Sequence, residues 1–153
     1  MTTCVFNPAL ETSAKLVLSK FPGVEFSTQT FVFPEISAVF PEQAYPHQWT
    51  HMGPSGYEYG DFTLSFMVDS KLENYRSIVE WIQKMPTMPH KECFSDAAII
   101  FTDGLRKPTG LKARLTDLMP THIGPLQYQV NIQNPQPLIA VAKFKYTQFY
   151  FEH

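Results

Sequence analysis

The chain has 153 residues and a formal net charge of −2, and only 17% of its residues are charged while 44% are hydrophobic. This length predicts one domain that can bury a core without disulfides or metal ions, and the low charge excludes a disordered charged tail. The balanced charge argues against a dedicated nucleic-acid binder, and the 14% of aromatic residues favours a surface covered by copies of the chain itself.

The amino-terminal part predicts a hairpin. Residues 14–19 can form a strand, and residues 24–33 contain many β-branched and aromatic side chains before a proline stops them. Pro22-Gly23 between the two segments is a turn signal. Residues 36–40 predict a short further strand.

Residues 41–60 predict a long loop. The segment is rich in proline, glycine and aromatic residues and has no clear period. A loop of this length in a small domain is usually functional or disordered, and the aromatic content argues against plain disorder. The domain or a neighbouring subunit is therefore expected to cover Tyr45, Trp49, Tyr57 and Tyr59.

Residues 61–68 alternate with period two and give the clearest predicted strand. Its strongly apolar face consists of Phe62, Leu64, Phe66 and Val68. The opposite face consists of Asp61, Thr63, Ser65 and Met67. One face is therefore expected on the core.

A helix is predicted over residues 71–85. Ser70 is a suitable N-cap and Glu73 completes a capping box, while Asp69 adds negative charge near the positive end of the helix dipole. Pro86 ends the helix, because the residue before a proline is disfavoured in helical geometry. The apolar stripe, expected on the core or a partner, is Leu72, Tyr75, Ile78, Val79, Ile82 and Met85.

The carboxy-terminal half predicts further strands at residues 96–101, 111–118, 127–132 and 138–151, with a connector at 120–125. Alternation in the second of them places Leu111, Ala113, Leu115 and Asp117 opposite to Lys112, Arg114, Thr116 and Leu118. Short connections predict antiparallel pairing. The predicted fold class is mainly β or α+β, an antiparallel β-sandwich or barrel of seven or eight strands with one flanking helix.

No catalytic, cofactor-binding or metal-binding set is predicted. His47 and His51 have HxxxH spacing, but they lack the glutamate of the protease motif and fall in the predicted loop. His90 and Cys93 form a single pair, and a Cys/His nucleophile would need an orienting third group. The seven glycines are too scattered to cradle a phosphate.

The densest positive cluster consists of Arg106, Lys107, Lys112 and Arg114. An exposed strand and turn explain this cluster more simply than nucleic-acid binding, because the net charge is close to zero. The first residues lack the features of a signal peptide, and no apolar run approaches the roughly 18 residues of a membrane helix. We therefore expect a cytosol-made protein with free thiols and no membrane insertion.

Residues 61–82 resemble the strand-then-helix signature of tail tube proteins from contractile-tailed bacteriophages. In that family a strand ending in Asp is followed by an Asn-Tyr or Asn-Trp pair and by an aromatic residue near the end of the helix. The residues that match this signature are Asp69, Asn74, Tyr75 and Trp81.

Three further segments resemble the same family. Residues 117–128 resemble its connector, and residues 140–150 resemble its closing strand. Residues 30–36 occupy the place of its Leu-Pro-Gly-Ile turn, where Glu35 replaces the glycine.

The resemblance implies a small β-sandwich whose strands join across six copies into one inner β-barrel ring. Stacked rings would form the tube that conducts genomic DNA into the host without binding it specifically, with sheath and baseplate proteins as partners. The protein would be part of the virion tail and would assemble in the host cytoplasm.

The resemblance also implies roles for individual segments. The loop at residues 41–60 would contact neighbouring copies, so the oligomer-interface candidates are Tyr45, Trp49, Tyr57 and Tyr59. The lumen-side candidates are Asp61, Thr63 and Ser65.

Two alternatives remain open at this point. The same fold serves the baseplate protein on which the tube nucleates, although 153 residues is nearer the length of a bare tube subunit. The remoter alternative is a small β-sandwich binding module or a metal-dependent enzyme that uses His47, His51 or His90.

Overall fold

The computed structural model of the protein describes residues 8–19, 28–45, 48–51 and 53–153. Within these residues there is one α-helix, α2 (Glu73–Lys84), and short 3-10 turns follow it at Met85–Thr87 and His90–Glu92. The strands are β1 (Ala14–Leu18), β2 (Thr28–Val32), β3 (Ile36–Val39), β4 (Glu42–Tyr45), β5 (Gln48–His51), β6 (Gly56–Tyr59), β7 (Phe62–Met67), β8 (Ser95–Thr102), β9 (Pro108–Ile123), β10 (Ile139–Lys145) and β11 (Gln148–Glu152).

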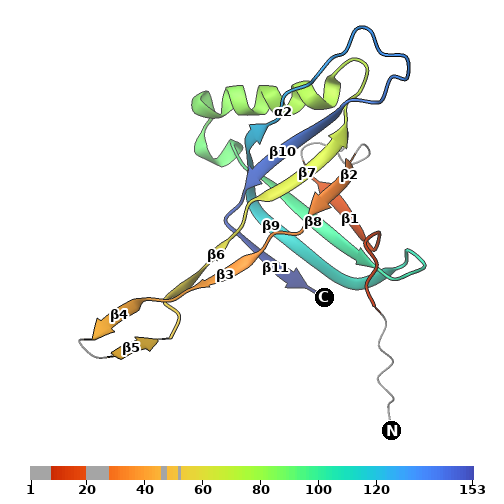
Figure 1. The fold of residues 1–153 in the computed structure, drawn as a ribbon. Helices are drawn as coiled ribbons and strands as arrows, with labels where there is room; N and C mark the ends of the chain where they lie inside the picture. Colours follow the sequence, from red (N-terminus) through yellow and green to blue (C-terminus); the bar gives the residue numbers. More distant parts are fainter. Residues whose placement is uncertain (1–7, 20–27, 46–47, 52) are drawn as a thin grey trace.

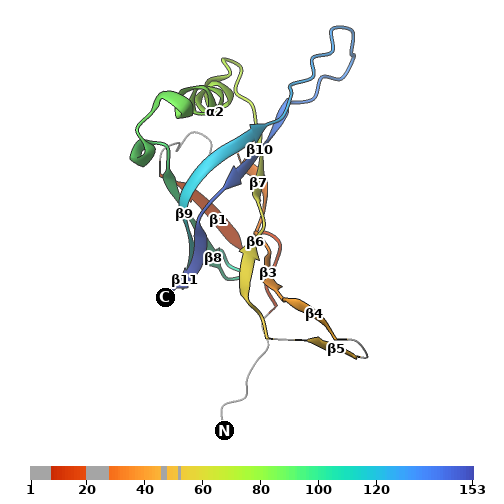
Figure 2. The same ribbon diagram turned by 90° about the vertical axis from the view of Figure 1, so that its left-hand side faces the viewer.

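The main sheet forms two layers that share one long strand (Figures 1 and 2). The first layer has the order β1-β8-β9-β11, and the second has the order β9-β10-β7-β2. The amino-terminal part of β9, up to Leu118, pairs with β8, and its end from Met119 to Ile123 pairs with β10. All these pairs are antiparallel and α2 flanks them, which confirms the predicted fold class.

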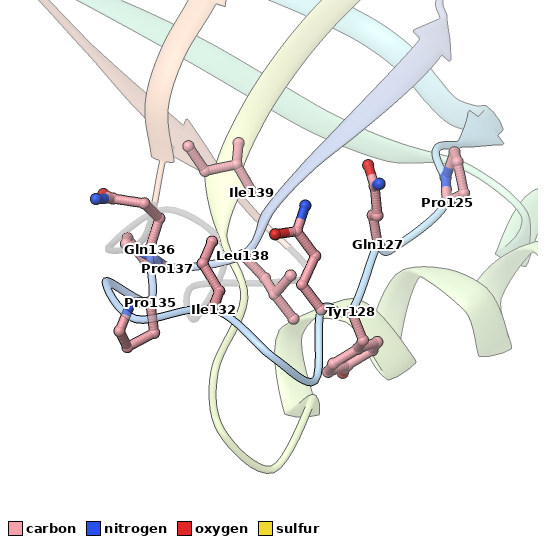
Figure 3. A pocket seen from close by; sticks show the side chains of 10 residues that line it. Pro125, Gln127, Tyr128, Ile132, Pro135, Gln136, Pro137, Leu138 and Ile139 are labelled. Atoms are coloured by element: carbon pink, nitrogen blue, oxygen red, sulfur yellow. The ribbon is translucent and has the colours of Figure 1, made fainter.

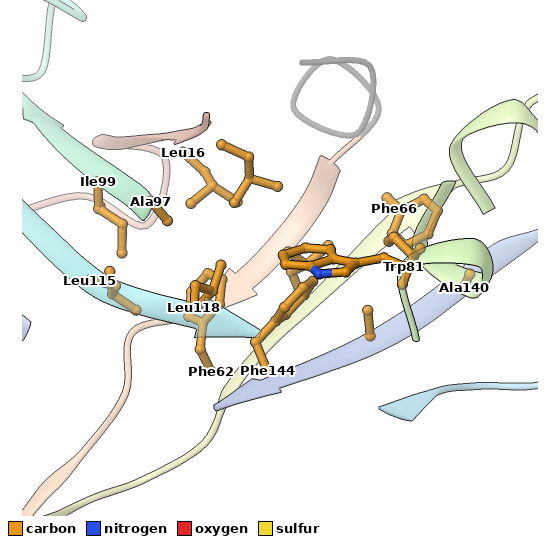
Figure 4. Packing of buried hydrophobic residues seen from close by; sticks show 14 of the residues in the cluster. Leu16, Phe62, Phe66, Trp81, Ala97, Ile99, Leu115, Leu118, Ala140 and Phe144 are labelled. Atoms are coloured by element: carbon orange, nitrogen blue, oxygen red, sulfur yellow. The ribbon is translucent and has the colours of Figure 1, made fainter. Parts of the chain in front are cut away.

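The core lies between the layers, where apolar faces of the strands meet (Figure 4). Phe62, Leu64 and Phe66 of β7 are buried, as the alternation predicted. The ring of Phe62 lies 6.2 Å from that of Phe144, which in turn lies 6.3 Å from the ring of Trp81 on α2. Part of the aromatic surplus of the sequence is therefore in the core.

A bulge in β9 turns the side chain of Leu118 to the face of the sheet opposite to the predicted one. Asp117 has a φ of 55°, in the left-handed region that favours glycine. Here the register with β8 shifts, from Leu115 opposite Ala97 to Leu118 opposite Ser95. Simple alternation placed Leu118 away from Leu115, but the extra residue turns it inward and both side chains are fully buried.

Several predicted connections are wrong because strand pairing is not local. The hairpin predicted from residues 14–33 does not form, since β1 pairs with β8 and β2 pairs with β7. The Pro22-Gly23 turn itself lies outside the described residues. The predicted connector at 120–125 largely belongs to β9, and the predicted strand at 138–151 is split into β10 and β11, which pair in different layers.

The strand predicted at residues 127–132 is also wrong. This segment is part of an exposed loop between β9 and β10, and Val130 within it is 94% exposed. None of the described strands pairs with it. Alternation of residue types alone therefore predicted a strand where no partner strand is present among the described residues. The neighbouring prolines at positions 125 and 135 favour an irregular path.

The helix starts later than predicted and without the predicted capping box. Leu72 occupies the N-cap position with a φ of 57°, and no side chain caps it there. Ser70 Oγ reaches only Asp69 Oδ1, at 3.5 Å. The buried residues of α2 are Asn74, Ile78 and Trp81, so the buried face is rotated relative to the predicted stripe. Within the described residues, no helix is long and apolar enough to cross a membrane.

Asn74 replaces the capping box as the link between β7 and α2. Its Nδ2 donates a hydrogen bond to the carbonyl oxygen of Met67 at 2.7 Å. Its Oδ1 accepts hydrogen bonds from the backbone N–H groups of Asp69, at 3.2 Å, and Tyr75, at 2.9 Å. One buried amide thus holds the turn and the first residues of the helix.

Replacing Asn74 with alanine is expected to lower the free energy of unfolding by about 1–3 kcal/mol, because three backbone groups lose their bonds to a buried amide. Ser70→Ala is the matched control and is expected to change it by less than about 0.5 kcal/mol. Urea unfolding measures both. A larger loss for Ser70→Ala than for Asn74→Ala would contradict this account of the helix start.

Candidate functional site

Residues 36–59 project from the body as an arm made of two β-ribbons (Figures 1 and 2). β3 pairs with β6 next to the body, and β4 pairs with β5 farther out. The predicted irregular loop at 41–60 is therefore mostly regular structure, in strands too short for their period to be visible in the sequence. Of the four predicted interface aromatics, Tyr45 and Trp49 lie in β4 and β5, and Tyr57 and Tyr59 lie in β6.

Aromatic rings hold the base of the arm. The ring centroid of Phe33, just before β3, lies 5.1 Å from that of Phe149 and 5.9 Å from that of Phe151. On β6, the ring of Tyr59 lies 5.0 Å from that of Phe149. Ring contacts of this kind contribute about 0.5–1.5 kcal/mol each beyond burial. We call this set the arm-base cluster: Phe33, Tyr59, Phe101, Tyr146, Phe149 and Phe151.

The arm-base cluster places the predicted interface tyrosines differently from one another. Tyr59 packs within its own chain, against Tyr146 and Phe149. Tyr57 packs edge-on against Tyr59 but stays 61% exposed. Tyr57 is thus available to a neighbour, whereas Tyr59 mainly fixes the direction of the arm.

Tyr146 ties the arm to the corner between β10 and β11. Its hydroxyl donates a hydrogen bond to the carbonyl oxygen of Gly60 at 2.8 Å. Burial, followed by the nearby Tyr59 and Asp61, raises the pKa of Tyr146 to about 12. Asp61, a predicted lumen residue, is exposed just before β7.

The other two predicted lumen residues lie on the outward face of the second layer. Thr63 and Ser65 are half-buried and alternate with the buried residues of β7. The hydroxyls of Thr30 and Ser65 contact each other across β2 and β7. This face is therefore partly polar, as the alternation predicted.

Pairing with β10 adds side chains to this face that the sequence did not reveal. Lys143 lies opposite Thr63 and is exposed, and Lys145 follows two residues later on the same face. Val32 on β2, also opposite Thr63, is 62% exposed. The outward face of the second layer is thus a mixture of hydroxyls, aliphatic groups and ammonium groups.

The remaining signature residues join α2 to the sheet. The Tyr75 hydroxyl donates a hydrogen bond to the carbonyl oxygen of Gly124 at 3.1 Å. The indole N–H of Trp81 donates to the carbonyl oxygen of Cys93 at 3.0 Å. Together with the bond between Asp69 and Asn74, these contacts show that the signature residues hold α2 in place against the rest of the domain.

A cavity of about 600 Å³ lies within the loop between β9 and β10 (Figure 3). Proline, glutamine and aliphatic side chains line it, together with Tyr128. Because its lining contains no carboxylate, imidazole, thiol or amine, it offers no acid–base pair for catalysis.

The histidines of the metal hypothesis are not brought together in the described part of the chain. No group of three His, Cys, Asp or Glu side chains there is placed to hold a metal ion. His90 packs edge-on against Phe94, with ring centroids 4.8 Å apart. His47 lies outside the described residues, and His51 is the last residue of β5.

No protein-family model matches the chain, and no curated protein matches it in sequence. Solved structures do match. A chain of the anti-feeding prophage cap, which terminates its tube, has a TM-score of 0.74 and 13% identity, covering 99% of this chain and 95% of that one.

Two further matches come from other parts of contractile particles. A chain of the sheath–tube complex of the PVC extracellular contractile injection system has a TM-score of 0.69 and 14% identity, over 99% of both chains. A chain of the six-fold symmetrised anti-feeding prophage baseplate has a TM-score of 0.66 and 10% identity, over 99% of this chain and 97% of that one.

The chain has the tail-tube fold. The predicted resemblance is thus confirmed at the level of the fold, over nearly the whole length of each chain. At this low identity the likeness carries the fold alone, and residue roles must come from the chain's own geometry.

The raised pKa of Tyr146 predicts that the stability of the packing at the base of the arm depends on pH. Since the folded pKa exceeds the usual value of 10.0, the contribution of the neutral phenol is present below pH 10 and is lost as the pH rises toward about 12. Burial also raises the pKa of Tyr59. Tyr146→Phe should therefore reduce the tyrosinate absorbance that appears above pH 10, and it should lower the free energy of unfolding at neutral pH by about 1 kcal/mol. Tyr128→Phe, at an exposed position, is the control. An absorbance change between pH 10 and about 12 that is as large in Tyr146→Phe as in the wild type would contradict the assignment.

Proposed function

We propose that the chain is a non-catalytic subunit that forms hexameric rings, and that these rings stack into the tail tube of a contractile-tailed phage. The observation that supports this best is a tail-tube fold whose main sheet has open edges. Among the described strands, β1 pairs with β8 alone and β2 pairs with β7 alone. Strand pairing between copies in a closed ring would remove these exposed edges.

Assembly and partners follow from the same proposal. The baseplate neighbour is six-fold symmetrised, which supports six copies to a ring, and the PVC neighbour comes from a complex of tube with sheath. Sheath and baseplate proteins are the proposed partners. The proposed location is the virion tail, assembled in the host cytoplasm.

The proposal also assigns the residues that face the lumen of the tube. We place Asp61, Thr63 and Ser65 on the lumen side, where strands of the second layer would join across copies. DNA would pass this wall in a phage tail, and a protein that conducts DNA should not retain it. Lys143 and Lys145 on the same face would hold phosphates, because each phosphate contact adds affinity. Asp61 follows Phe62 in the register with β10 and so supplies one carboxylate near Lys145. Passage of DNA would need further carboxylates near these two lysines.

A second candidate is a ring at one end of the tube. It is favoured by the likeness to the tube-terminating cap and to the baseplate. Such a protein would form single rings that do not stack alone. A tube subunit would form rings that stack, so negative-stain images of the purified protein distinguish the two candidates.

Purified protein is expected to form six-membered rings or tubes in negative-stain images, and a persistent monomer at high concentration would contradict the proposal. Shortening the arm should block this assembly without unfolding the body. Val39 and Gly56 are cross-strand partners, so residues 40–55 can be replaced by an Asn-Gly turn. The shortened protein should keep its thermal unfolding midpoint within a few degrees. Tubes formed by this variant would show that the arm is not an interface.

The lumen assignment predicts protection of Thr63. In a Cys4→Ser background, Thr63→Cys should react with a maleimide carried on a polymer too wide for the lumen in the monomer, but not in the tube. Glu80→Cys on α2 is the matched control and should react in both states. Equal labelling of Thr63→Cys in both states would place this face on the outside of the tube.

A further inference from the structure

The arm and the segments around it carry acidic charge without basic charge. From residue 28 to residue 70 the sequence contains no Lys or Arg. The acidic residues in this span are Glu35, Glu42, Glu58, Asp61 and Asp69. Glu35, Glu58 and Asp61 are exposed at the arm and its base. The arm and its base thus present exposed carboxylates together with an exposed aromatic ring at Tyr57, and we call them the acidic ribbon.

The outward face of the first layer and the adjoining turn carry more basic than acidic side chains, although Asp96 and Glu152 lie on this face as well. We call this set the basic patch: Lys15, Arg106, Lys107, Lys112 and Arg114. All five side chains are exposed. Lys15 and Lys112 both lie opposite Ile100, one from each neighbouring strand, so two ammonium groups flank one aliphatic side chain. The turn between β8 and β9 adds the cations at positions 106 and 107.

A small cavity lies at one end of the basic patch, away from the turn between β8 and β9. The cavity, of about 210 Å³, is lined by Val17, Ala98, Arg114 and Tyr150, and also by Asp96. Arg114 Nε is held 2.6 Å from Glu152 Oε2, which fixes the guanidinium at the rim. Outside the cavity, the exposed ammonium groups of Lys15, Lys107 and Lys112 complement a segment that carries carboxylates.

The arm and the basic patch point in different directions within one copy. In Figure 1 the arm extends to the lower left, whereas the turn between β8 and β9 lies on the right. A contact between them therefore joins two copies through different surfaces. Such head-to-tail contacts repeat around a ring or along a stack.

We propose that the arm of one copy docks on the basic patch of an adjacent copy. This inference rests on the proposed function, since it names the surface that receives the arm in the assembly. Nucleic acid is the competing polyanion for the same patch. A second copy fits better because the chain itself supplies an acidic ribbon of matching chemistry, while its overall charge is −2.

Charge reversal on each side tests the contact. The arm variant is Glu35→Lys/Glu58→Lys, and the patch variant is Lys107→Glu/Lys112→Glu. Each variant alone brings like charges together, so the concentration needed for assembly should rise at least about tenfold. Glu73→Lys/Glu80→Lys, at two exposed positions of α2, has the same charge change as the arm variant and should assemble as the wild type does.

Mixing the two variants gives the decisive result. In an alternating assembly, each reversed arm meets a reversed patch and each native arm meets a native patch. A one-to-one mixture should therefore regain assembly to within about twofold of the wild type. Circular dichroism and thermal unfolding of each variant alone show that it is folded before mixing.

The outcomes separate this inference from the proposed function. A wild-type protein that never assembles would overturn both. Wild-type rings together with unimpaired assembly of the arm and patch variants would overturn this inference alone. A one-to-one mixture that fails to assemble would also overturn this inference. So would a patch variant that assembles normally but no longer binds duplex DNA at about 50 mM salt.

Discussion

The structure depends on a single strand that belongs to both layers. β9 is 16 residues long, and the bulge at Asp117 lets it leave the first layer and enter the second. Because the bulge turns Leu118 inward beside Leu115, both parts of the strand contribute to one core. The layers are therefore joined by backbone hydrogen bonds as well as by packing.

Among the described strands, joining the layers through β9 leaves each end of the strand path paired on one side only. β1 begins the path and β2 ends it, so each offers backbone groups along one side. Those groups need water or another strand. The chain continues from β2 through Phe33 into the arm, and the arm-base cluster fixes the direction in which the arm leaves the body. An open edge and a rigid projection thus arise from the same region, which suits a molecule that joins copies of itself.

Periodicity predicted what depends on one segment alone. The facing of Phe62, Leu64 and Phe66, the strand at residues 96–101 and most of the helix follow from local patterns of apolar residues. The bulge at Asp117 and the partners of β1 and β2 depend on contacts between distant segments, so a local Pro-Gly signal predicted the wrong hairpin.

The position of the arm in the sequence could be predicted, but its strands and contacts could not. The sequence marked residues 41–60 as unusual and expected their aromatic side chains to be covered. The cover of Tyr59 comes from Tyr146 and Phe149 in its own chain, which no spacing in the sequence could indicate. Likewise, Lys143 joined the face of Thr63 only through the pairing of β10 with β7.

The central claim is that other copies complete the open edges of the sheet. Hydrogen exchange of β2, compared by mass spectrometry between dilute monomer and assembled protein, tests it most directly. The amides of β2 should exchange much more slowly in the assembly, whereas those of β7, already paired on both sides, should change little. Exchange of β2 at the same rate in both states would contradict the claim.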